Sequence, residues 1–174
     1  MTSFDANDIP VRHKNDVGEF TLLPATGLND ARASDAGRSL MELFHERSGG
    51  KRLLRRNDFS PLDLKPFLTN IIILDVVYGE DGLVCDGIVR LMGSALATFY
   101  GENTGTSVLA HPSSSGARFI AGARAAIECQ KSVIGTATQA LPNRPLYRVV
   151  TCMTPVANAD GTVVQMLGLI ELFS

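Results

Sequence analysis

The feature that most constrains the fold is a pair of extended runs separated by four turn residues. Ile71-Ile72-Ile73-Leu74-Asp75-Val76-Val77-Tyr78 consists mostly of β-branched and aromatic residues, which is typical of a strand. Gly79-Glu80-Asp81-Gly82 follows directly, and a second extended run covers Val84 to Met92. Because so short a connection joins antiparallel neighbours, residues 71–92 are predicted to form a β-hairpin.

Three further strands are predicted at residues 132–140, 146–155 and 163–173. The last two are joined by Asn158-Ala159-Asp160-Gly161, where Asn, Asp and Gly tolerate the left-handed backbone angles of a tight hairpin. A sheet with one apolar face needs helices to cover it. The expected fold is therefore α+β, with a five-stranded antiparallel sheet and short helices and one longer helix on one face.

Apolar residues at three- and four-residue steps predict a helix over residues 36–47. Ser34 is available as its N-cap, and Gly49-Gly50 is expected to end it. Ser60-Pro61-Leu62-Asp63 is the pattern of a second, short helix that ends near Leu68. Both helices come before the hairpin, so they are expected to flank the sheet.

The connection between the hairpin and the last three strands is also predicted to be helical. It contains a short helical run at residues 94–100 and a longer helix at residues 117–130. The chain is therefore divided into an N-terminal arm, partly flexible, at residues 1–33, flanking helices at residues 34–68, and a core domain at residues 69–174.

Composition limits the classes of partner. With 174 residues, 45% of them hydrophobic and 20% charged, the chain has the balance of one globular domain. A net charge of -2 provides no strong field for nucleic acid or an anionic membrane. The longest apolar run is too short to cross a bilayer, and the three cysteines cannot all be bridged. We expect a cytoplasmic protein with neither nucleic acid nor a membrane as partner.

The order of the predicted elements is that of a PAS domain, and several motifs occur at corresponding places. They are Arg56-Asn57-Asp58-Phe59-Ser60-Pro61-Leu62-Asp63-Leu64-Lys65-Pro66-Phe67-Leu68, Ile73-Leu74-Asp75-Val76, Val89-Arg90-Leu91-Met92-Gly93-Ser94, Tyr100-Gly101-Glu102-Asn103-Thr104-Gly105, Thr154-Pro155-Val156 and Leu167-Gly168. In this order and spacing they resemble the bacterial PAS-like family found mostly in alphaproteobacteria, whose members are often stand-alone domains. The resemblance covers about residues 40–173.

The resemblance implies a sensory or protein-interaction module, in which a small molecule or a partner biases the sheet and its flanking helix. It does not imply catalysis. No nucleophile, base and orienting group share a recognisable spacing, so we do not expect an enzyme. Since no output segment follows the core domain, the signal is expected to pass to a separate partner protein.

The resemblance also bears on cofactors. PAS domains that bind haem usually use a histidine on the long helix, whereas His111 lies before that helix and is better explained as part of its cap. Those that form flavin adducts use a cysteine in a Gly-x-Asn-Cys context, and Gly101-Glu102-Asn103-Thr104 has Thr104 at that place. Haem and flavin are therefore disfavoured, and the cofactor is left unknown. His13, His45 and His111 form no ligand-spacing motif, so no metal site is expected.

In this architecture the concave face of the sheet and the covering helices enclose a pocket, which aromatic rings, methionines and a few polar groups would line. The predicted ligand-binding residues are Arg90, Leu96, Phe99, Tyr100, Phe119, Ala123, Thr151, Met153 and Met166. The same residues could equally fill a packed core. For Arg90, strand alternation leaves two interpretations, a pocket anion site or a structural ion pair.

Two functions remain open at this point. One is a sensor that binds a small ligand, dimerises and signals to a partner. The other is a ligand-free dimerisation scaffold, in which residues 36–47 pair with a second copy of the chain. A homodimer through this N-terminal helix is expected in either case. The basic run Lys51-Arg52-Leu53-Leu54-Arg55-Arg56 could bind phosphate or an acidic partner, although a solvated link is favoured.

Overall fold

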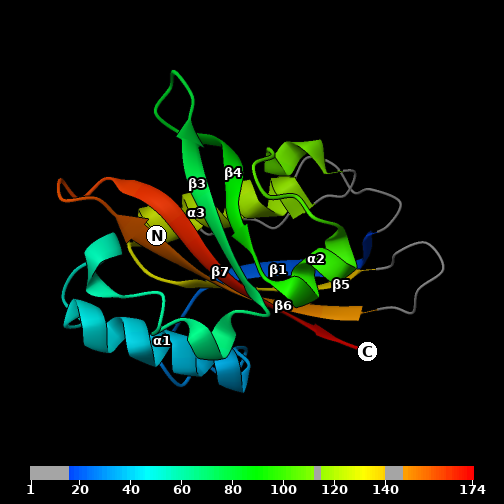
Figure 1. The fold of residues 1–174 in the computed structure, drawn as a ribbon, viewed down its shortest axis with the longest axis horizontal. Coiled ribbons are helices and arrows are strands. Elements are labelled where there is room, and N and C mark those ends of the chain that lie inside the picture. The colour runs from blue at the N-terminus through cyan, green and yellow to red at the C-terminus, as the bar shows by residue number, and fades with distance from the viewer. Residues whose placement is uncertain (1–15, 112–114, 140–146) are drawn as a thin grey trace.

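One sheet organises the chain, with helices on both of its faces (Figure 1). The computed structural model describes residues 16–111, 115–139 and 147–174. Within these residues the sheet has seven strands, and its main path runs in the order β1-β5-β6-β7-β3-β4. The strands are β1 (Asp16–Pro24), β2 (Leu54–Arg55), β3 (Ile71–Tyr78), β4 (Val84–Met92), β5 (Val133–Gln139), β6 (Tyr147–Ala157) and β7 (Val163–Phe173).

Three α-helices and three short 3₁₀ helices accompany the described strands. They are α1 (Asp35–Ser48), α2 (Ser94–Tyr100), α3 (Ser115–Cys129), η2 (Arg56–Asp58), η3 (Lys65–Phe67) and η4 (Val108–Ala110). Helix α1 covers one face of the sheet, while α2 and α3 cover the other (Figure 1). No helix among the described residues is long and apolar enough to cross a membrane.

The sheet separates two apolar cores because neighbouring residues of a strand point to opposite faces. On β3, Ile71 packs in the core under α1 and Ile72 packs in the core under α2 and α3. On β6, Cys152 packs in the core under α1 and Met153 packs in the core under α2 and α3. Every central strand therefore contributes to both cores.

The α+β class and the five antiparallel strands β3–β7 are confirmed, including the hairpins at residues 71–92 and 147–173. The sheet gains β1, which lies within the segment predicted as an arm and pairs antiparallel with β5. Pro24 ends this strand, and its missing N–H is tolerated because β1 is an edge strand. Residues 1–15 of the predicted arm lie outside the described residues.

Helix α1 begins and ends where the sequence predicts. The Ser34 hydroxyl accepts a hydrogen bond from the Gly37 N–H at 3.0 Å, and Gly49 closes the helix in the left-handed region with φ of 69°. Its apolar side chains Leu40, Met41 and Phe44 are buried against the chain's own sheet. The face on which the predicted homodimer rested is therefore already covered, and a dimer would need another surface.

The second predicted helix forms a series of tight turns instead of an α-helix. Backbone N–H groups between Asp63 and Phe67 bond to carbonyls three residues earlier, which is the 3₁₀ pattern. Pro66 lies within this stretch and has no N–H for an α-helical bond. Asp63 still accepts from the Ser60 N–H at 2.7 Å, as the predicted capping pattern requires.

Candidate functional site

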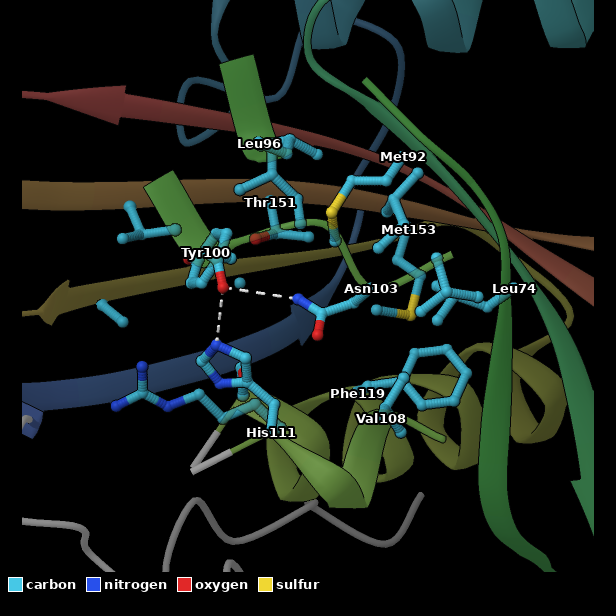
Figure 2. A pocket seen from close by; sticks show the side chains of 18 of the residues that line it. Leu74, Met92, Leu96, Tyr100, Asn103, Val108, His111, Phe119, Thr151 and Met153 are labelled. Atoms are coloured by element: carbon cyan, nitrogen blue, oxygen red, sulfur yellow. Dashed lines mark hydrogen bonds between the residues drawn. The ribbon is translucent and has the colours of Figure 1, made fainter. Parts of the chain in front are cut away.

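The core under α2 and α3 contains a cavity of about 120 Å³ (Figure 2). Its wall is almost entirely apolar and comes from the strands, α2, α3, η4 and the loop that follows α2. The residues labelled in Figure 2 are Leu74, Met92, Leu96, Tyr100, Asn103, Val108, His111, Phe119, Thr151 and Met153.

Helix α2 is held against the sheet by a close backbone approach at Gly93. A Cβ atom there would lie 2.4 Å from the carbonyl oxygens of Leu68 and Thr69, so a larger residue would push the helix away. The Gly93 N–H donates to Ile71 O at 2.8 Å. Leu96 and Tyr100 then follow at helical spacing on the face turned to the cavity.

Helix α3 is fixed by two further glycines. A Cβ on Gly87 of β4 would lie 2.3 Å from the Phe119 ring, so the ring packs directly on the strand backbone. A Cβ on Gly116 would lie 2.5 Å from Val108 O, which brings the start of α3 onto η4. These contacts position Phe119 as one wall of the cavity.

The loop between α2 and α3 supplies three polar side chains of the wall, Asn103, Ser107 and His111, and is tied down by hydrogen bonds. His111 Nε2 and Asn103 Nδ2 lie 3.0 Å and 3.3 Å from the Tyr100 carbonyl oxygen (Figure 2). A carbonyl only accepts, so both nitrogens donate. The Ser107 hydroxyl donates to the Asp86 carboxylate at 2.7 Å and accepts from the Leu109 N–H at 3.1 Å.

Five of the residues predicted from the sequence line this cavity. They are Leu96, Tyr100, Phe119, Thr151 and Met153. They come from α2, α3 and β6, which are distant in sequence and are brought together by the crossover from the hairpin to the last strands.

Phe99, Ala123 and Met166 are buried beside the cavity without lining it. The Phe99 ring packs edge-on against Tyr100 and Tyr147 at centroid distances of 4.8 Å and 4.9 Å. Ala123 and Met166 are fully buried in the same core. In the structure, Phe99, Ala123 and Met166 therefore fill the packed core, which is the alternative that the sequence left open.

Arg90 faces away from the cavity and forms an ion pair with Asp75. Its side chain is 61% exposed. The pairing between β3 and β4 shifts here, from Ile73 opposite Leu91 to Leu74 opposite Val89, so Arg90 is the extra residue of a bulge. The prediction that it lines the pocket is therefore wrong, and the alternative of a structural ion pair is what the structure shows.

Asn103, His111 and Met92 also line the cavity, and the sequence analysis did not place them there. In the motif Gly101-Glu102-Asn103-Thr104, the prediction about flavin depends on position 104 alone. Thr104 itself is exposed, whereas the preceding Asn103 reaches the cavity wall.

Two of the four basic side chains in the run before β3, Arg52 and Arg56, contact other side chains of the protein. Arg52 forms a two-bond pair with the Asp58 carboxylate at 2.6 Å and 2.7 Å. The Arg56 guanidinium lies 5.0 Å from the Phe59 ring centroid. These contacts favour a structural link over a phosphate site. Among the described residues, no group of three His, Cys, Asp or Glu side chains is placed to hold a metal ion.

Comparison with known proteins identifies similar folds and no similar sequence. No protein-family model and no curated protein matches the chain. An RNA-binding light-oxygen-voltage receptor aligns with a TM-score of 0.52 at 16% identity, over 90% of this chain and 39% of the receptor. A light-oxygen-voltage domain described with a flavin analogue aligns at 0.43 and 13% identity, covering 64% of this chain and 82% of that domain. A fungal light-oxygen-voltage photoreceptor aligns at 0.41 and 16% identity, covering 85% of this chain and 98% of that one.

The match to the receptor shows that the chain has the fold of the PAS superfamily, to which light-oxygen-voltage domains belong. The expectation that flavin is disfavoured has to be corrected, because the receptor with the similar fold is a light-oxygen-voltage protein. Because Thr104 replaces the cysteine, a covalent flavin adduct is not expected at this position. Noncovalent binding of a flavin does not require that cysteine. The expectation for haem stays a prediction.

Proposed function

We propose that this chain is a sensory domain of PAS type that binds a small, largely apolar molecule in the cavity under α2 and α3. The signal passes to a separate partner protein, and the chain itself performs no catalysis. The observation that carries this proposal is an apolar hollow of about 120 Å³ in an otherwise packed core.

The size of the hollow argues that it has an occupant. Empty volume enclosed in a protein core costs about 24 cal/mol for each Å³, so a hollow of about 120 Å³ costs up to about 3 kcal/mol where solvent does not fill it. This is a large part of the stability of an ordinary domain. Apolar cavities of about 150 Å³ stay dry and bind benzene-sized molecules. A ligand that fills the hollow recovers the lost packing.

Flavin is one candidate ligand, because similar folds occur among light-oxygen-voltage domains and the apolar walls suit an aromatic ring. RNA binding is a property of the receptor to which the chain is similar, and the net charge of -2 gives no reason to transfer it. The motifs that resemble the bacterial PAS-like family support a stand-alone bacterial domain.

The scaffold alternative rests on α1 pairing with a second copy of the chain. Leu40, Met41 and Phe44 are buried in the core between α1 and the sheet of the same chain, so that pairing would have to separate the helix from the sheet. This burial favours the sensor.

Native mass spectrometry of protein purified from cells tests the proposal, with visible absorbance as a separate check for flavin. We expect one small molecule bound per chain, released on unfolding. The matched control is Ala137→Leu, which adds a side chain to the cavity wall and should purify without the molecule. A wild-type protein that carries no molecule, and that binds no aromatic probe after refolding, contradicts the proposal.

A further inference from the structure

Two polar atoms of the cavity wall have no protein partner among the described residues: the Thr151 hydroxyl and the side-chain oxygen of Asn103. The Asn103 amide nitrogen donates to Tyr100 O at 3.3 Å and to Gly101 O at 2.9 Å. Since both partners are carbonyl oxygens, only the NH₂ group can face them, and this fixes the orientation of the amide. The amide oxygen Oδ1 therefore lies on the other side, away from these carbonyls (Figure 2).

The other polar side chains of the wall are already engaged. Ser107 bonds to Asp86, and His111 bonds to the Tyr100 carbonyl. Ser115 and Arg118 also have interaction partners within the protein. What the cavity still offers a ligand is the acceptor on Asn103 and the hydroxyl on Thr151.

Asn103 is partly exposed, so a ligand that covers it removes its remaining water, and its amide oxygen then needs a donor from the ligand. A water molecule would need two or more polar partners at the same point. The cavity wall as a whole is largely apolar, and Tyr100 and His111 lie beside Asn103. A donor carried by the ligand satisfies the oxygen without such a cluster.

We infer that the ligand is an apolar ring compound that donates one hydrogen bond, from an N–H or O–H group, to Asn103 Oδ1. Its ring lies between Leu74, Phe119 and Met153, and the Thr151 hydroxyl accepts or donates a second hydrogen bond. The inference rests on the proposed function and adds the chemistry by which the site chooses among apolar molecules.

Isothermal titration with indole and benzothiophene tests the inference, because the two rings have nearly the same shape and only indole carries an N–H donor. In Asn103→Leu the ratio of indole to benzothiophene affinity should fall about tenfold relative to wild type, which is the usual weight of one hydrogen bond. Thr138→Val is the control, since Thr138 neighbours the cavity residue Ala137 on β5 and does not line the cavity. In this control the ratio should not change.

Asn103→Leu also removes two bonds to backbone carbonyls, so a measurement on the wild-type protein accompanies it. In proton NMR of the indole complex, the indole N–H should show cross-relaxation to the Asn103 side chain. An unchanged ratio in Asn103→Leu, or an N–H proton that shows cross-relaxation to Phe119 and none to Asn103, overturns the inference while binding itself stands. Failure of both probes to bind wild type overturns the inference and the proposed function together.

Discussion

Filling the cavity should stabilise the protein, and the sign of this effect tests the whole account of the site. Ala137 is buried on β5 with its side chain in the cavity wall. The change Ala137→Leu adds three carbon atoms to a hollow of about 120 Å³. At about 0.8 kcal/mol for each buried carbon, the gain is about 2 kcal/mol. For a chain of this length that raises Tm by roughly 4–8 °C.

The assay is urea unfolding of ligand-free protein, prepared by denaturing and refolding both forms. An unchanged slope with a higher midpoint reports a true gain in stability. The matched control is Ala123→Leu, because Ala123 is fully buried in the same core without touching the cavity. There the same three carbons have no space, and we expect a loss of about 1–3 kcal/mol.

A loss of stability in Ala137→Leu, equal to that in the control, would refute the reasoning. It would show that side chains fill the region in solution and that no hollow awaits a ligand.

Three further predictions concern parts of the fold outside the cavity. Leu40→Ala in α1 should lower the free energy of unfolding by about 2–5 kcal/mol, measured by urea unfolding, because Leu40 is fully buried between helix and sheet. The Arg32 guanidinium holds the pKa of Asp30 well below its usual range, so Asp30 stabilises the fold above about pH 4 and this contribution is lost as the pH falls further. Asp30→Asn should therefore be less stable than wild type at neutral pH, with a difference in urea midpoints that shrinks toward pH 2. Burial raises the pKa of the Cys152 thiol to about 12, so a thiol reagent should modify exposed Cys85 in the native protein and reach Cys152 only after unfolding.

The sequence predicts the central sheet well because its signals are local. The β-branched run at Ile71–Tyr78 and the turn at residues 158–161 each specify a hairpin from neighbouring residues alone. Strand β1 depends instead on pairing with β5, more than one hundred residues away in the chain. A segment that contains Gly18 and ends at Pro24 carries little strand signal of its own.

The cavity residues also differ in whether local sequence signals are enough to place them. Leu96 and Tyr100 share a helical face, so one correct placement implies the other. Arg90 could not be placed, because it is the extra residue of a bulge in β4, opposite Ile73 and Leu74, and the bulge changes the alternation on which such an assignment depends. Asn103 could not be found from composition, since its position follows from hydrogen bonds to two carbonyls at the end of α2.

Strand β6 connects the cavity to the opposite face of the molecule. Thr151 and Met153 line the cavity, while Cys152 between them is buried in the core under α1. Close-packed interiors have little free volume, so a displacement of this strand by a bound molecule changes the packing in both cores. Helix α1 lies on the far side, and Leu40 makes its contact with the sheet through that second core. The thickness of one sheet therefore separates the cavity, where the proposed ligand would bind, from helix α1 on the opposite face.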